Sequence, residues 1–203
     1  MYIPHLNKMT DRDKMISFMK AYSFATIVTV EDNVPTATHL PFVITESETG
    51  IILSAHFAKA NSQWKQLTNK NQVLVIFAEP HAYISPRHYD SELNVPTWNY
   101  ISVHTYGKAE IVSDETGGMD ELEKMINRYE PEYLDQWRNL PAEMKLKLLQ
   151  AIIPFRIAVK EVQAKEKLSQ NKNENERKRI IDSLQKSEHS TERDIAGYMQ
   201  QIQ

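Results

Sequence analysis

The sequence predicts a mainly β protein, a largely antiparallel barrel with helices at its periphery. Three observations favour this fold class. Roughly six short segments rich in apolar and β-branched residues follow one another between residues 24 and 162. One of them, residues 96–107, alternates side-chain types over its whole length. Amphipathic helical repeats flank these segments, and closing the sheet into a barrel removes its exposed edges.

The segment 96–107 places different surfaces on its two faces, because successive side chains of a strand point in opposite directions. One face is mostly aromatic and polar: Trp98, Tyr100, Ser102, His104 and Tyr106. The other is mostly aliphatic and small polar: Asn99, Ile101, Val103 and Thr105. The aromatic face has two interpretations. It is either a set of large core or interface side chains with satisfied polar tips, or the wall of a ligand site.

The N-terminal third is expected to form one helix and then three strands. Residues 11–22 repeat apolar side chains at helical spacing after a cap at Thr10. The predicted strands are residues 24–30, 36–44 and 51–55. Pro41 cannot donate a ladder hydrogen bond, so the second strand must have an edge, a bulge or a break at Leu40–Pro41.

The middle of the chain is expected to alternate between strands and helices. A helix is expected to begin at Asn61 or Ser62, which are both good capping residues. Further strands are predicted over residues 72–78, with an extended continuation over 80–86, over 96–107 with a continuation through 108–112, and over 155–162. Further helices are predicted over residues 119–129 and 142–152.

A change of composition predicts a domain boundary near the C-terminus. We interpret residues 1–163 as the barrel domain with helical insertions and residues 164–203 as a helical extension. Apolar residues at helical spacing within the extension predict two short helices, near residues 180–184 and over 191–202. The run Arg177-Lys178-Arg179 is either a solvated helix face or a small basic patch for phosphate or DNA.

Composition argues against several classes of function. The net charge of −3 argues against a basic footprint over the whole surface, as a dedicated nucleic-acid-binding domain would show. The absence of cysteine excludes disulfides, thiolate metal sites and cysteine nucleophiles. The seven histidines lack His-x-x-x-His spacing, so we expect no metal site. Neither a long apolar run nor a signal-peptide pattern occurs, so we expect no membrane span and a cytoplasmic location.

Two segments could bind a flat, phosphorylated ligand. In Thr36–Pro41, a strand broken by proline leaves backbone groups free for a planar heteroaromatic ring, although a purely structural bulge explains the pattern as well. In residues 54–62, a strand end precedes a helix N-terminus, which suits a phosphate; simple helix capping is the alternative. The polar side chains of this second segment include Ser54, His56, Lys59 and Asn61.

Seven blocks of sequence resemble the PaiB family of bacterial regulators. The blocks are Met1-Tyr2-Ile3-Pro4, Ala37-Thr38-His39-Leu40-Pro41, Ala55-His56-Phe57-Ala58-Lys59-Ala60-Asn61, Tyr83-Ile84-Ser85-Pro86, Val95-Pro96-Thr97-Trp98-Asn99-Tyr100, Val103-His104-Thr105-Tyr106-Gly107 and Lys167-Leu168-Ser169-Gln170-Asn171. They span nearly the whole chain in the family's order. The resemblance implies a split β-barrel of the FMN-binding, pyridoxamine phosphate oxidase-like kind, assembled as a homodimer with two flavin-type sites at the interface.

The resemblance also implies which residues bind the cofactor, FMN. The flavin ring would lie along the strand that holds Thr38, His39 and Leu40. The phosphate would lie near Ser54, His56, Lys59 and Asn61, and the interface would add Trp98, Asn99, Gln170 and Asn171. The related oxidases hold the phosphate with an Arg-Lys pair, whereas this loop has Lys59 alone. One missing charge-assisted hydrogen bond weakens binding by about 1.5–3 kcal/mol, roughly 10- to 150-fold.

The function that the resemblance implies is negative transcriptional regulation of sporulation and of degradative (protease) enzyme synthesis, either directly on DNA or through a small ligand. The alternative is a flavin-dependent oxidoreductase of the pyridoxamine phosphate oxidase-like or haem-degrading kind, with His39, His56 and Trp98 around the flavin. A third hypothesis is a scaffold whose barrel serves only for dimerisation. No catalytic residue is assigned, and a regulator is favoured over an enzyme.

Overall fold

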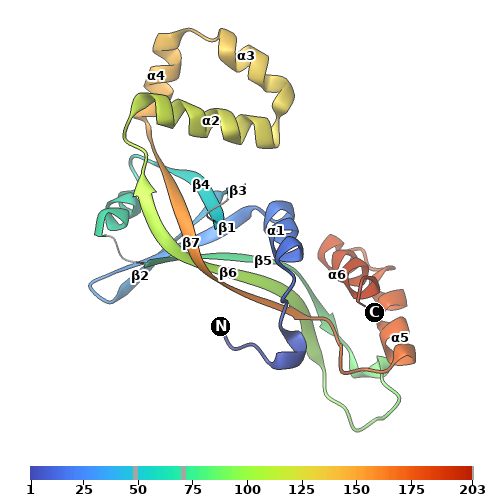
Figure 1. Cartoon of the computed structure of the whole chain (residues 1–203). Helices are drawn as coiled ribbons and strands as arrows, with labels where there is room; N and C mark the ends of the chain where they lie inside the picture. The colour runs from blue at the N-terminus through green and yellow to red at the C-terminus, as the bar shows by residue number, and fades with distance from the viewer. Residues whose placement is uncertain (48–49, 70–71, 203) are drawn as a thin grey trace. The chain divides into compact units, whose positions relative to one another are not determined.

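The structure is a computed structural model that describes residues 1–47, 50–69 and 72–202 of the 203-residue chain (Figure 1). The chain divides into two compact units. The barrel unit comprises Ile16–Phe77 and His104–Val162, and the terminal unit comprises Met1–Met15, Ala78–Val103 and Gln163–Gln203. The domain boundary expected between residues 163 and 164 stays a prediction.

All seven strands contribute to the sheet of the barrel unit, in the order β2-β1-β5-β6-β7-β4-β3 over the described residues (Figure 1). Their bounds are β1 Phe24–Glu31, β2 Val34–Pro41, β3 Val43–Ser47, β4 Gly50–Ala58, β5 Gln72–Ile84, β6 Thr97–Ile111 and β7 Ile152–Lys167. β1 pairs with β2 and β5, and β4 pairs with β3 and β7, in each case antiparallel. The long strands β5, β6 and β7 also contribute residues to the terminal unit.

The chain passes directly between the two end strands of this order. β2 ends at Pro41 and β3 begins at Val43, so Phe42 alone separates them. The Phe42 amide donates to the Ser23 carbonyl (2.9 Å), and the Phe42 carbonyl accepts from the Tyr129 hydroxyl (3.1 Å). The predicted break at Leu40–Pro41 is therefore confirmed, and the chain passes there from one end strand of the sheet to the other.

Aromatic side chains fill the interior of the barrel unit. Phe42, Phe57, Phe77 and Phe155 are fully buried. The Phe42 ring lies 6.1 Å from that of Phe77 and 6.3 Å from that of Phe155, and Phe155 stacks on Phe57 at 5.1 Å between centroids. Offset and edge-to-face pairs of this kind add to the stabilisation that burial provides. Phe42, which links β2 to β3, is thus also a central residue of the core.

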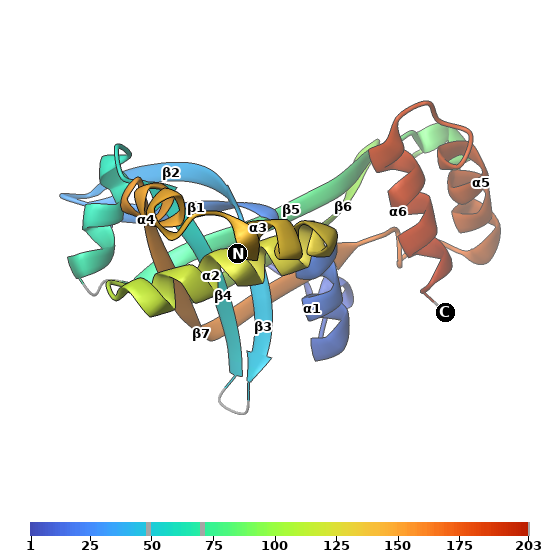
Figure 2. The same cartoon turned by 90° about the horizontal axis from the view of Figure 1, so that it is seen from above.

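The helices lie outside the sheet. They are α1 Arg12–Ala21, the 3₁₀ segment η2 Ser62–Asn69, α2 Glu115–Tyr129, α3 Leu134–Asn139, α4 Ala142–Gln150, α5 Glu174–Leu184 and α6 Ser190–Gln200, with shorter 3₁₀ turns elsewhere. In the terminal unit α5 and α6 lie side by side (Figure 2). α2 begins four residues earlier than predicted because Asp114 caps it, accepting a hydrogen bond from the Gly117 amide (2.7 Å). The mainly β fold with peripheral helices is confirmed.

A buried carboxylate ties α2 to the sheet. The side chain of Glu121 is 5% exposed, and its Oε1 accepts from Lys124 Nζ (2.7 Å) and Arg156 Nε (2.6 Å). Burial on its own raises the pKa of Glu121, but hydrogen bonds from Lys124, Ser54 and Arg156 outweigh it and leave the pKa below its usual value. The ionised form is therefore favoured in the folded state, and it stabilises the protein at pH values above the unfolded-state pKa.

Replacing this carboxylate should lower stability in a pH-dependent way. We expect Glu121→Gln to reduce the free energy of unfolding by about 1–2 kcal/mol at pH 7 because charge-assisted hydrogen bonds are lost. The difference from the wild type should shrink as the pH falls below about 4.3, where the wild-type carboxyl also becomes protonated. Urea unfolding at several pH values measures this. Asp120→Asn, on an exposed position of the same helix, is the control, and equal effects of both substitutions would contradict the assignment.

Candidate functional site

The strand β2 is an end strand of the sheet and carries three of the predicted cofactor residues. It pairs with β1 along its whole length, and among the described residues it has no strand on its other edge. Thr38 and Leu40 are half-buried, whereas His39 is exposed and its ring stacks on that of Phe24 at 6.2 Å between centroids. Backbone N–H and C=O groups on the outer edge of β2 are therefore available to a planar ligand.

A buried amide fixes the loop after β4 against this strand. Gln63 is 1% exposed; its Nε2 donates to Thr29 Oγ1 (3.0 Å) and to the Thr36 carbonyl (3.0 Å), and its Oε1 accepts from Thr38 Oγ1. Asn61 completes the network, because its Nδ2 donates to Thr38 Oγ1 (3.1 Å) and its Oδ1 accepts from the Gln63 amide (3.0 Å). The structure thus brings together Thr38 and Asn61, two of the predicted site residues.

The backbone of Lys59 is held in the same loop, while its side chain is exposed. The Lys59 amide donates to the Ala151 carbonyl (2.8 Å), and its carbonyl accepts from Trp64 Nε1 (3.1 Å). The Asn61 amide closes the turn on the Ala58 carbonyl (2.9 Å). No ion pair of the Lys59 ammonium occurs within the described part of the chain. The loop therefore has a fixed backbone, is bonded to β2 through Asn61 and Gln63, and carries one exposed lysine side chain.

Ser54 and His56 lie on the face of β4 opposite its core face. Ser54 is buried and contributes a hydrogen bond that lowers the pKa of Glu121, so a negative charge already occupies its surroundings. Burial lowers the pKa of His56 below its usual value, so the imidazole is neutral at pH 7. Neither side chain therefore supplies positive charge to a phosphate. Their assignment as cofactor residues stays a prediction.

The other four predicted residues belong to the terminal unit and lie in different surroundings. Trp98 is half-exposed and packs against His81 (5.3 Å between centroids) and Tyr83 (6.1 Å). Asn99, on the opposite face of β6, is fully buried and bonded to Ser169. Gln170 folds back onto its own turn, accepting from the Leu168 amide and donating to the Glu166 carbonyl, and Asn171 lines a small pocket. A role of these four in a flavin site stays a prediction.

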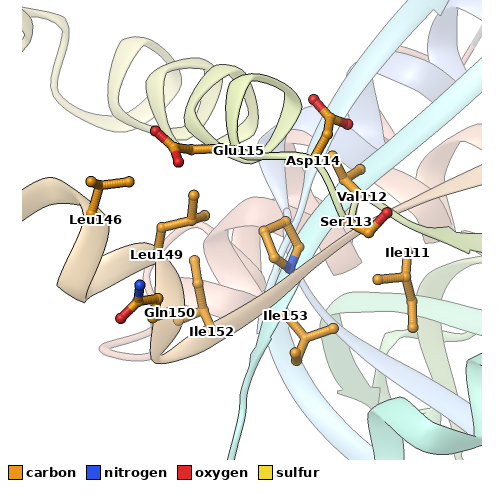
Figure 3. Close-up of a pocket in the computed structure, with 11 residues that line it drawn as sticks. Ile111, Val112, Ser113, Asp114, Glu115, Leu146, Leu149, Gln150, Ile152 and Ile153 are labelled. Carbon is orange, nitrogen blue, oxygen red and sulfur yellow. The ribbon is translucent and has the colours of Figure 1, made fainter.

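The barrel unit also contains an apolar hollow that holds none of the predicted residues. It has a volume of about 350 Å³ and lies between the start of α2, the end of α4 and the neighbouring ends of β6 and β7 (Figure 3). Leu146, Leu149, Ile152 and Ile153 form much of its wall, and Asp114 and Glu115 lie on the α2 side. The two carboxylates make this hollow unsuitable for a phosphate.

Sequence reasoning missed Gln63 and Glu121, which organise the surroundings of the predicted residues. Gln63 stands four residues before the buried Leu67 in the short η2 segment, and this spacing is the one sequence signal that it faces inward. Glu121 lies in an amphipathic helix and resembles any charged surface residue in the sequence. Its partner Arg156 lies opposite Ser54 in the pairing of β4 with β7, a register that sequence did not predict.

Comparisons with known proteins give the family. The family model described as "Putative FMN-binding domain" matches residues 1–161. The "Protease synthase and sporulation protein PAI 2" of Bacillus subtilis is 39% identical over 204 residues, covering 98% of this chain and 97% of that protein.

No helix among the described residues is long and apolar enough to cross a membrane.

Solved structures share the fold. The flavocytochrome Anf3 from Azotobacter vinelandii has a TM-score of 0.64 at 20% identity, covering 80% of this chain and 70% of that chain. The FAD and heme binding protein from Mycobacterium smegmatis has a TM-score of 0.63 at 17% identity, covering 79% of this chain and 73% of that chain. The predicted split β-barrel is confirmed. The chain therefore belongs to the PaiB family of FMN-binding domain proteins.

Proposed function

We propose that this protein binds FMN in its barrel unit and acts, as a cytoplasmic homodimer, as a negative regulator of sporulation and protease synthesis. The observation that carries the flavin proposal is the open edge of β2 beside the loop that holds Lys59. Gln63 fixes that loop to the strand through hydrogen bonds to Thr36 and Thr38. An open strand edge suits the polar rim of a flat ring, and a lysine on the loop that is bonded to that strand suits a phosphate.

Within this site the residues have different roles. The flavin ring lies along the backbone of Thr38, His39 and Leu40, and the exposed His39 imidazole is beside it. Lys59 supplies the positive charge for the phosphate. Asn61 fixes the loop, because both ends of its side-chain amide are already bonded within the protein. Ser54 is a poor phosphate partner because it lies next to the Glu121 carboxylate.

The homodimer proposal rests on an exposed aromatic cluster in the terminal unit. Trp98 and Tyr83 are about half exposed, at 51% and 47%, and pack against each other. A hollow of about 350 Å³ lies next to Trp98 and is lined by His81, Tyr100 and other side chains of β5 and β6. Aromatic side chains of this kind are enriched at protein interfaces and often dominate their binding energy.

Regulation through a ligand is better supported than a broad basic DNA-binding surface. Of the three cations in the Arg177-Lys178-Arg179 run, Arg177 donates to the carbonyls of Met199 and Ile202, and Arg179 donates to the His88 carbonyl and pairs with Asp90. Lys178 is left exposed. The regulatory role itself comes from the Bacillus subtilis relative, whose name associates it with protease synthesis and sporulation.

Flavin-dependent oxidoreduction is the second candidate function. The specific observation in its favour is the exposed His39 imidazole on the strand that would hold the ring, where a side chain able to exchange protons would be next to a flavin. The solved structures of similar fold include a flavocytochrome and a protein that binds FAD and heme. No catalytic residue is assigned to this chain.

Loss of the loop cation should weaken flavin binding. We expect Lys59→Met to lower the affinity for FMN by about tenfold or more, the usual effect of removing one charge-assisted hydrogen bond. Titration of FMN with protein, followed by the flavin fluorescence, measures the dissociation constant. Lys65→Met is the matched control, since Lys65 is an exposed lysine on the neighbouring η2 segment. A wild-type protein that does not bind FMN, or equal losses in the two variants, would refute the site.

A charge in the aromatic cluster should separate the subunits. We expect the wild-type protein to sediment with twice the 23.6 kDa mass of one chain, and Trp98→Glu to shift it towards the monomer because a carboxylate is costly to bury at an interface. Leu93→Glu introduces the same charge at a 96% exposed position in the loop before β6 and should leave the dimer intact. Sedimentation velocity distinguishes the two. A wild-type monomer at micromolar concentration would rule out the dimer.

Regulation should depend on the flavin site. In a host that lacks the gene, we expect secreted-protease and sporulation reporters to rise, and the wild-type gene to return them to their original level. The Lys59→Met gene should restore repression only in part, whereas the Lys65→Met gene should restore it fully. Immunoblotting controls for protein amount. Full repression by Lys59→Met, together with measured loss of FMN binding, would show that the regulatory role does not require the flavin.

A further inference from the structure

The turn that follows β7 borders a small pocket that lies apart from β2 and from the loop that carries Lys59. The pocket belongs to the terminal unit and has a volume of about 300 Å³. Polar side chains make up much of its lining: Thr97, Asn99, Lys167, Ser169, Asn171 and Lys172. The pocket thus brings two lysines together with hydroxyl and amide groups.

The turn is held rigidly by its own side chains. Ser169 adopts a left-handed conformation (φ 58°), and its hydroxyl exchanges hydrogen bonds with the side-chain amide of Asn99 (3.0 and 3.1 Å). Leu168 is fully buried, and Gln170 Oε1 accepts from its amide (2.7 Å). Asn99 and Gln170 therefore position the turn, and the lysines before and after it are presented from a fixed backbone.

Neither lysine is neutralised within the described residues. Lys167 Nζ donates to the Thr97 hydroxyl. Lys172 Nζ lies 3.6 Å from the centroid of the Tyr89 ring and donates to Asn94 Oδ1 (3.1 Å). None of the ion pairs among the described residues includes either ammonium group. Partial burial lowers the pKa of Lys167, and the nearby positive charge of Lys165 acts in the same direction.

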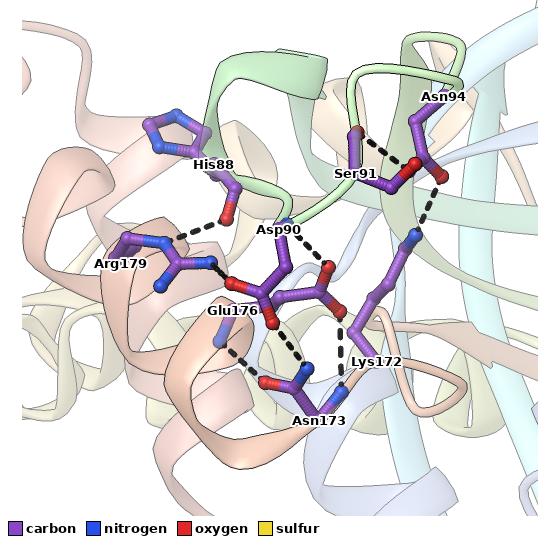
Figure 4. Close-up of polar contacts among 8 residues, drawn as sticks. All are labelled: His88, Asp90, Ser91, Asn94, Lys172, Asn173, Glu176 and Arg179. Carbon is purple, nitrogen blue, oxygen red and sulfur yellow. Dashed lines mark hydrogen bonds and ion pairs between the residues drawn. The ribbon is translucent and has the colours of Figure 1, made fainter.

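Two carboxylates drawn with Lys172 are bonded to other groups (Figure 4). Glu176 accepts from the backbone amides of Asp90 (2.9 Å) and Asn173 (3.3 Å), and so forms one half of the capping box of α5. Asp90 accepts from Arg179 (2.5 Å) and from the Asn173 side chain (2.8 Å). These contacts hold the loop before β6 and the start of α5 in place, and none of them includes the Lys172 ammonium.

We propose that this pocket binds the phosphate group of a small phosphorylated molecule, with Lys167 and Lys172 as its cationic contacts and Thr97 and Asn171 as its neutral ones. A phosphate monoester carries about −1.5 to −2 charges at pH 7, which matches two ammonium groups better than one carboxylate would. The proposal goes beyond the flavin site on β2, because its two lysines belong to the terminal unit; it assigns to this second ligand Asn171, which the family resemblance placed at the flavin. It gives the protein a second ligand through which metabolite levels could be sensed.

Inorganic phosphate is the probe that tests the pocket. We expect phosphate at millimolar concentration to raise the melting temperature of the wild-type protein above its value in sodium chloride of equal ionic strength, because a ligand that binds the folded state stabilises it. The double variant Lys167→Met/Lys172→Met should lose this increase, and Lys178→Met, an exposed lysine on α5, should keep it. Calorimetric titration should show at least about a tenfold lower phosphate affinity in either single variant.

Further variants distinguish a loss of phosphate binding in this pocket from an effect on the flavin site and from misfolding. Lys172→Arg keeps the positive charge and should keep phosphate binding. If only the methionine variants lose binding, the loss is due to the missing positive charge. The double variant should bind FMN as the wild type does. A wild-type protein that responds equally to phosphate and chloride, or a double variant that still binds phosphate, would overturn the proposal. So would loss of FMN affinity in the double variant, since the lysines would then belong to the flavin site.

Discussion

The buried amide of Gln63 is the interaction on which the arrangement of the candidate site depends. It binds groups from β1 and β2 and, through Asn61, the loop that follows β4. A buried amide without partners is costly, so these segments gain stability only when all of them are in place together. The result is an open strand edge bonded to a loop that carries one exposed lysine. The proposed site for a planar, phosphorylated molecule therefore depends on Gln63, a residue whose own role is structural.

The barrel separates the residues that stabilise it from those that remain available to a ligand. Phe42 links β2 to β3 along the chain and packs among other buried phenylalanines, and Glu121 joins α2 to Arg156 on β7. Ser54 also contributes a hydrogen bond to Glu121. Lys59 has a held backbone and an exposed side chain. In the terminal unit Asn99 holds a turn, whereas Lys167 and Lys172 line a pocket.

Much of the fold could be predicted from the sequence because its signals are local. Pro41 cannot continue a ladder, and the strand ends there; the alternation in residues 96–107 predicted that β6 has two different faces, but it left open whether the aromatic face is core, interface or ligand wall. Other features depend on distant partners. The short helix α3 and the full lengths of β4, β5 and β7 come from pairing and packing, and the roles of Gln63 and Glu121 come from segments far apart in sequence. Family resemblance supplied the cofactor class, and local patterns alone left several alternatives open.

The most direct test of the central claim is native mass spectrometry of the protein purified from cells and then incubated with excess FMN. The account predicts a species of two chains that carries two flavin mononucleotides, since each barrel offers one open strand edge with one lysine beside it. A single chain without any bound flavin would contradict it.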